Sequence, residues 1–150
     1  MATQYTAGFS IGQVLTAANM NSIGAAWETY TPTLTQGVAV AKTVNYARYC
    51  QIQKTVILQV LLTCTGAGLG GTISVSLPSS LVPSTISAQR VIGSFFIHDS
   101  GTALYVGLAT GESPVKGYSY GSTNNMGAAL PIMTLAANDQ VSIAVTYEVA

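Results

Sequence analysis

The stretch that indicates the fold most clearly is 140–149, Gln-Val-Ser-Ile-Ala-Val-Thr-Tyr-Glu-Val. Every second residue in it is large and apolar, and these residues are Val141, Ile143, Val145, Tyr147 and Val149. Because successive side chains of a β-strand point to opposite faces of a sheet, this alternation predicts a strand with one buried face. Asn138 and Asp139 supply a turn directly before it. We therefore expect the chain to end in a strongly paired strand.

Shorter segments of the same texture precede this strand. Residues 55–64 form the most apolar run, and residues 72–77 alternate between apolar and polar side chains. Two further segments, 90–97 and 102–109, flank the turn residues His98-Asp99-Ser100-Gly101. Weaker strand patterns lie at 29–35, 44–52, around Tyr118 and Tyr120, and at 129–135. About eight short strands with no long helix between them predict an all-β fold, an antiparallel β-sandwich or barrel.

The first 28 residues are different in character, because they are rich in Ala, Asn and Gly and hold the one segment that resembles a helix. Thr16 can cap this helix, residues 17–23 make about two turns, and Gly24 ends it. So short a helix is unstable alone and must dock, either on its own domain or on a partner. The apolar side chains available for docking are Phe9, Ile11, Val14, Leu15, Met20 and Ile23. We therefore divide the chain into an anchoring arm, 1–28, and a β-sandwich domain, 29–150.

Composition excludes several classes of function. The chain has 150 residues, of which 49% are hydrophobic and only 7% are charged, against about 25% charged in an average soluble domain. Five basic residues balance five acidic ones, so the chain lacks the basic surface that binding to nucleic acid requires. No segment has the length of a membrane span or the pattern of a signal peptide. A surface so poor in charge indicates either a compact coat of neutral polar residues or a chain that packs against other chains.

Two glycine motifs match the residue patterns of enzyme signatures but lack the surrounding features that those signatures require. Residues 66–71 match the dinucleotide-binding motif G-x-G-x-x-G, but a strand follows them where a helix is needed, which favours a hairpin loop. Residues 117–121 match the nucleophile motif G-x-S-x-G around Ser119, yet the single histidine, His98, comes earlier in the chain. An esterase acting through Ser119 is the enzymatic alternative. We expect no enzymatic activity, no catalytic residue and no cofactor.

A metal site is not expected either. One histidine and two cysteines without a recognisable ligand spacing do not make a zinc site. The five carboxylates are scattered along the sequence and do not form a calcium-binding cluster. Cys50 and Cys64 are interpreted as two small buried apolar residues, and the sequence leaves open whether a single bridge joins them.

Several stretches resemble structural proteins of tailed bacteriophages. Residues 9–21 contain the pattern G-x-V-L-T-A-A-x-M-N, which is similar to an N-terminal segment of those proteins. Residues 27–35 resemble the opening of a β-sandwich module, and residues 47–56 resemble its strand pair G-R-Y-x-Q-I-G-K-T-V, with Ala47 and Gln53 in place of the two glycines. Residues 99–107 and 146–148 are also similar.

This resemblance implies a jelly-roll-like module, usually trimeric, on the outside of a virion. Such modules occur at the ends of tail fibres, in minor tail proteins and as small proteins that decorate capsids. A fibre carries a shaft before its head module, whereas here only the arm precedes the sandwich. We therefore expect a homotrimeric capsid decoration or cement subunit, attached through its arm to the major capsid protein and exposed on the virion surface after assembly in the host cytoplasm.

The alternative expectation is a minor tail or tail-tip fibre protein that contacts other tail proteins. Its β-sandwich would bind a glycan or protein on the host surface. The candidate receptor contacts are Tyr118, Tyr120, Asn124 and Asn125, because aromatic faces and amides suit sugars. We expect neither nucleic acid nor a membrane as a partner.

Overall fold

The structure is a computed structural model that describes residues 14, 26–85, 91–119 and 121–150. Over these residues the protein is all-β, with ten strands and no helix. The strands are β1 (Glu28–Thr29), β2 (Leu34–Gln36), β3 (Val38–Ala39), β4 (Lys42–Ile52), β5 (Thr55–Cys64), β6 (Ser74–Val75), β7 (Val91–Asp99), β8 (Ala103–Thr110), β9 (Val115–Ser119) and β10 (Gln140–Glu148).

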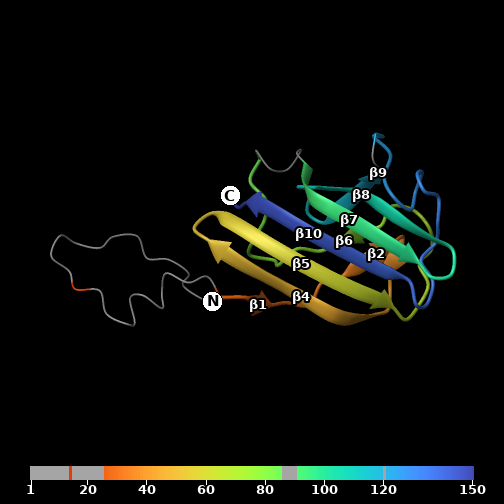
Figure 1. Cartoon of the computed structure of the whole chain (residues 1–150), viewed down its shortest axis with the longest axis horizontal. Coiled ribbons are helices and arrows are strands. Elements are labelled where there is room, and N and C mark those ends of the chain that lie inside the picture. Colours follow the sequence, from red (N-terminus) through yellow and green to blue (C-terminus); the bar gives the residue numbers. More distant parts are fainter. Residues whose placement is uncertain (1–13, 15–25, 86–90, 120) are drawn as a thin grey trace.

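The strands form one curled sheet in the order β1-β4-β5-β10-β7-β8-β9-β6-β2-β3. Every pair of neighbouring strands is antiparallel. The long strands β4, β5, β10 and β7 lie at the front in Figure 1, and β6 and β2 lie behind them. The sheet thus resembles half of a barrel, with its concave side around the core.

Strand β10 lies at the centre of the long strands, between β5 and β7, where Val141 is opposite both Leu62 and Ile97. The predicted inward face of this segment is confirmed, because its four alternating residues in β10 and Val149 directly after the strand are each at most 8% exposed. The matching face of β5 is completely buried at Val56, Leu58, Val60 and Leu62. At roughly 25 cal/mol per Å² of apolar surface, this burial is the main contribution to stability.

The expected sandwich of about eight strands is not confirmed, since ten strands follow one another in a single hydrogen-bonded order. Pro32 interrupts the predicted strand 29–35 because proline has no N–H to donate, so the segment forms β1 and β2 instead. The strand predicted at 129–135 does not form, and the one β-bridge that this segment makes with the described residues joins Ile132 to Gly127. The predicted helix, 16–23, lies outside the described residues.

The glycine-rich loop 66–71 is not a hairpin loop, which corrects the sequence interpretation. Strand β5 pairs with β4 and β10, whereas β6 pairs with β2 and β9, so the loop carries the chain across the curl. Its glycine at position 68 lies so close to Gln36 that an added Cβ would overlap the Gln36 carboxamide oxygen. The chain therefore needs glycine at position 68 because a side chain there would collide with Gln36.

The side chain of Gln36 is completely buried and joins three segments. Its Nε2 donates to the carbonyl of Met133 at 2.8 Å and to that of Gly71 at 3.2 Å. Its Oε1 accepts a hydrogen bond from the N–H of Leu135 at 2.8 Å. One carboxamide thus fastens the crossing loop and the segment before β10 to β2.

Asp139 makes a second link of this kind. Its carboxylate is 2% exposed and accepts the N–H groups of Ser100 and Ala136, each at 2.8 Å. These bonds connect the turn between β7 and β8 to the turn before β10. The predicted hairpin at 98–101 is confirmed, with Asp99 opposite Ala103 and Gly101 at a φ of 80°.

The two cysteines are buried and free. Cys50 is opposite Ile57 in the β4–β5 pair, and Cys64 is opposite Lys42. Ile57 and Cys64 are separated along β5 by roughly 23 Å at about 3.3 Å per residue, so the fold excludes a bridge between the cysteines. Burial raises the pKa of the Cys64 thiol to about 11, and the nearby Asp139 adds to this effect.

We predict that Gln36→Leu lowers the free energy of unfolding by about 2–4 kcal/mol. The substitution leaves the buried N–H of Leu135, the buried carbonyl of Met133 and the part-buried carbonyl of Gly71 without this partner, and each unsatisfied buried group is costly. Urea unfolding measures the loss. Gln59→Leu is the matched control, because Gln59 only accepts exposed bonds from Arg48, and its cost is expected to stay below about 1 kcal/mol. Equal losses in both variants contradict the role given to Gln36.

Candidate functional site

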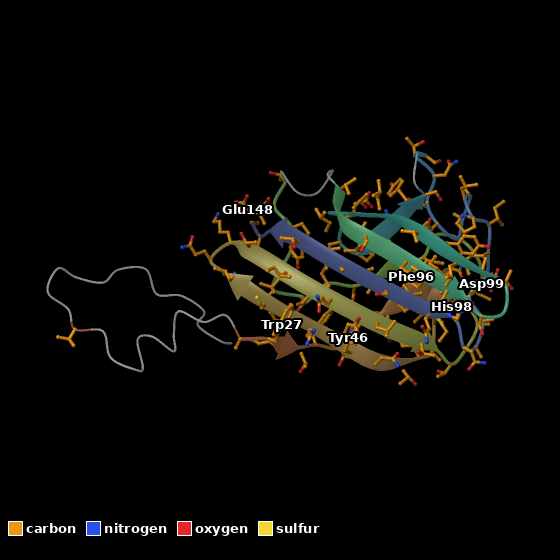
Figure 2. All side chains as sticks on the ribbon, viewed as in Figure 1. Trp27, Tyr46, Phe96, His98, Asp99 and Glu148 are labelled. Carbon is orange, nitrogen blue, oxygen red and sulfur yellow. The ribbon has the colours of Figure 1, made fainter. Side chains whose placement is uncertain are left out.

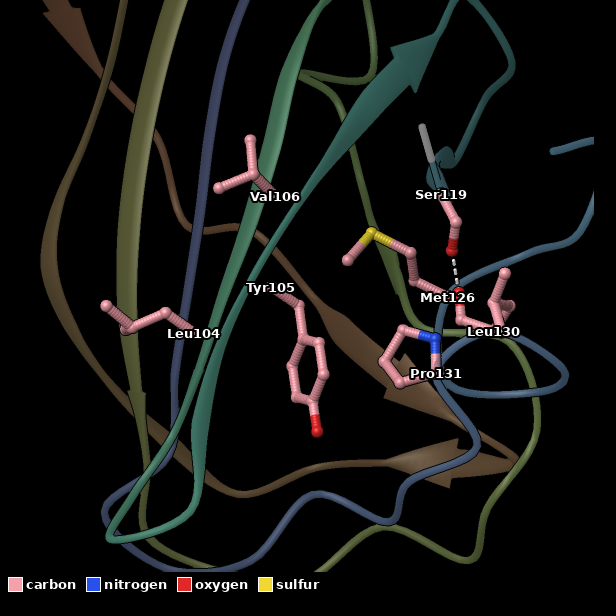
Figure 3. A pocket seen from close by; sticks show the side chains of 7 residues that line it. All are labelled: Leu104, Tyr105, Val106, Ser119, Met126, Leu130 and Pro131. Atoms are coloured by element: carbon pink, nitrogen blue, oxygen red, sulfur yellow. Dashed lines mark hydrogen bonds between the residues drawn. The ribbon is translucent and has the colours of Figure 1, made fainter. Parts of the chain in front are cut away.

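An apolar hollow lies beside β8. Strand β9 pairs with β8 only from Gly107 to Ala109, so residues 103–106 have no strand partner on that side among the described residues. The hollow along this free edge has a volume of about 340 Å³. Its lining, drawn in Figure 3, consists of Leu104, Tyr105, Val106, Ser119, Met126, Leu130 and Pro131. None of these side chains carries a charge.

The rim of the hollow exposes large apolar side chains. Leu104 is 64% exposed, Val106 67% and Leu130 50%. We call these three residues the β8 patch. Single exposed apolar residues are ordinary, whereas a group of them beside an unpaired strand edge is a feature that many protein interaction surfaces share.

Ser119 closes one wall of this hollow. Its hydroxyl donates a hydrogen bond to the carbonyl of Leu130, which holds the loop before β10 against the end of β9 (Figure 3). His98 is opposite Leu104, whereas Ser119 is opposite Gly107. The two residues are therefore separated by roughly 10 Å along the strands and by two strand spacings of about 4.8 Å. The fold does not bring the serine and the histidine together.

A second hollow, of about 310 Å³, lies beside Tyr118. Val91, Leu108, Thr110, Glu112, Tyr118, Ser122 and Thr123 line it. Glu112 forms an ion pair with Lys116, and this contact raises the pKa of the lysine. The hydroxyl oxygen of Thr110 is buried without a hydrogen-bond partner in the described part of the chain. This hollow therefore combines an aromatic ring, hydroxyl groups and a carboxylate.

Three of the four predicted receptor contacts lie in this region. Tyr118 lines the second hollow, and its backbone forms an isolated bridge with Asn125. Asn124 is exposed, and its N–H bonds to the Ser122 hydroxyl at 3.0 Å. Tyr120 lies outside the described residues. Sequence reasoning missed Thr110 and Glu112, although the polar segment after the strand 102–109 was a signal that could have found them.

Most of the predicted anchoring residues cannot be placed. Phe9, Ile11, Leu15, Met20 and Ile23 lie outside the described residues, and Val14, which is described, is 79% exposed.

The junction between arm and domain is held against β4. The guanidinium carbon of Arg48 lies 4.6 Å from the centre of the Trp27 ring and 5.8 Å from that of Tyr46. Figure 2 shows Trp27 and Tyr46 beside β4. The Tyr49 hydroxyl donates to the Glu28 carboxylate at 2.5 Å. Trp27 and Glu28, the last residues of the sequence-defined arm, therefore contact the domain.

Within residues 26–85, 91–119 and 121–150, no three His, Cys, Asp or Glu side chains gather as metal ligands would. The same residues include no helix with the length and apolar character of a membrane span. Comparison of the chain with known protein families, with curated proteins and with solved structures found no match.

We predict that Ser119 does not react with a fluorophosphonate, because no imidazole lies near enough to take its proton. Intact-mass spectrometry is expected to find no adduct. Ser119→Ala removes the bond to Leu130 and is expected to lower the free energy of unfolding by about 1 kcal/mol. Ser79→Ala, at an exposed position, serves as the control. An adduct that forms on the wild type and disappears in Ser119→Ala contradicts this structural role.

Proposed function

We propose that the protein is a non-enzymatic structural subunit of a tailed-bacteriophage virion. In this proposal it forms a homotrimer that decorates or cements the capsid, and its N-terminal arm attaches it to the particle. The observation that carries the proposal is the β8 patch, an exposed apolar surface beside a free strand edge in a chain with only 7% charged residues. Such a surface suits a subunit that is covered by its neighbours.

Assembly with other copies removes this exposure. In a closed ring of three, the β8 patch of each copy meets a different surface of the next copy, and no patch remains free. The net charge of zero means that copies do not repel one another as they approach. A free edge left uncovered would instead promote irregular association.

The turn between β4 and β5 supports the resemblance to phage proteins. Gln53 has a φ of 54°, in the left-handed region that favours glycine. Glycine is the residue that the similar phage modules carry at this position. The turn geometry of the phage strand pair therefore fits this chain, although the residue differs.

We also propose the finer architecture that this resemblance implies, a jelly-roll-like β-sandwich over residues 29–150. The curl of the sheet supports it, because β2 and β6 lie behind β5 and β10 in Figure 1. Leu34 of β2 and Val75 of β6 belong to one hydrophobic core with Val60 and Ile143 of the front strands. Two layers facing a shared core are the arrangement that a sandwich requires.

We predict that light scattering gives the purified chain a mass three times the 15.5 kDa of one chain. The double variant Leu104→Asp and Val106→Asp places unpaired charges in the apolar contact and is expected to weaken assembly on the order of 100-fold. Ile52→Asp, also at an exposed apolar position, serves as the control and is expected to stay trimeric. A wild-type monomer at micromolar concentration rules the trimer out.

We predict that deletion of residues 1–25 leaves a cooperatively folding β domain and abolishes its association with virions. The deletion spares the contacts of Trp27 and Glu28 with β4. The full-length variant Leu15→Asp with Ile23→Asp is expected to lose association as well, and Gln4→Asp is its matched control. Circular dichroism monitors folding, and co-sedimentation with particles monitors association. If the truncated domain still binds particles at full occupancy, attachment is not a function of the arm.

The alternative is a minor tail or tail-tip protein whose β domain binds a receptor on the host surface. The hollow beside Tyr118 favours it, because a concave site with an aromatic ring and several hydroxyl groups serves recognition rather than packing. Adsorption of the labelled protein to host cells distinguishes the two roles, since a decoration subunit has no need of it.

A further inference from the structure

We infer that the hollow beside Tyr118 is a binding subsite for one neutral pyranose unit of a polysaccharide. The inference rests on the receptor-binding alternative proposed above and names its class of ligand. The hollow of about 310 Å³ is at the lower end of the roughly 300–1,000 Å³ that small-molecule sites span, which fits one sugar ring.

One wall of the hollow suits the apolar face of a sugar ring. Tyr118 is opposite Leu108 in the pairing of β8 with β9, and both residues line the hollow. Val91, 57% exposed, extends the apolar wall from β7. The C–H groups on one face of a pyranose pack against an aromatic ring, which also leaves the sugar hydroxyls free for polar contacts.

The other groups in the hollow suit sugar hydroxyls. Thr110 lines the hollow, and its hydroxyl oxygen lacks a partner among the described residues, so a ligand hydroxyl that reached it would satisfy a polar group that the fold leaves unpaired. The Ser122 oxygen accepts the N–H of Asn124, so its own proton is available to a ligand. Glu112 supplies a carboxylate that accepts hydroxyl groups.

The charges at this place select a neutral ligand. Glu112 is paired with Lys116, so the two charges largely cancel. The carboxylate lines the hollow and disfavours an anion such as phosphate. A neutral pyranose keeps the ion pair intact and uses the carboxylate as an acceptor.

The test is a titration of the ¹⁵N-labelled full-length protein with methyl glucoside, methyl galactoside and methyl mannoside. We expect at least one of these probes to bind with a Kd on the order of 1 mM. The amide signals that move are expected to be those of Thr110, Glu112, Tyr118 and Ser122.

Four variants make the test specific. Tyr118→Ala is expected to weaken binding about tenfold or more, whereas Tyr118→Phe keeps the ring and stays within about twofold. Thr110→Val is expected to weaken binding about fivefold without a loss of thermal stability, because the hydroxyl has no partner in the free protein. Tyr46→Ala removes an exposed tyrosine on β4 and is the control that leaves binding unchanged.

The inference is overturned if none of the probes shifts these signals at roughly 20 mM, well above the expected Kd. It is also overturned if the shifts persist in both Tyr118→Ala and Thr110→Val. Host-cell adsorption separates this failure from that of the receptor role. Adsorption without sugar binding refutes the ligand class alone, and sugar binding without adsorption refutes the receptor role while supporting the sugar site.

Discussion

The three hydrogen bonds of the buried Gln36 carboxamide fasten the back of the curled sheet to the loops that lead into and out of its front. Because β5 and β6 do not pair, the chain must cross the curl through loop 66–71, and Gln36 fixes that crossing. The same side chain holds the backbone of Met133 and Leu135, which follow Leu130 in the segment before β10. The position of Leu130 in the β8 patch therefore depends on this buried amide, whereas Leu104 and Val106 are held by the pairing of β8 with β7.

The short strand β9 produces both candidate surfaces. It pairs with only three residues of β8, which leaves the edge of 103–106 free for the apolar hollow. Successive residues of a strand point to opposite faces, so Ser119 lines the apolar hollow while Tyr118 lines the polar one. One strand end thus separates the surface that we propose for other copies of the chain from the surface that we propose for a small polar ligand.

The sequence predicted what depends on local periodicity, such as the buried face of β10 and the hairpin at 98–101. It did not predict the order of the strands, because short strands that pair over long distances carry little information about their partners. Residues 129–135 have the composition of a strand, but Gln36 takes backbone groups there that a sheet partner would need. Thr110 and Glu112 join Tyr118 only through the pairing of β8 with β9.

The most direct test of the proposal that this sparsely charged chain is a surface subunit of a virion is an image of the particle that carries it. Electron cryomicroscopy of virions from the source of the chain can locate the domain and its orientation. We predict threefold density on the outside of the capsid, with the β8 patch turned toward neighbouring copies and the Tyr118 hollow turned toward solvent. Density that places the domain inside the capsid, or that leaves the β8 patch facing solvent, contradicts the proposal.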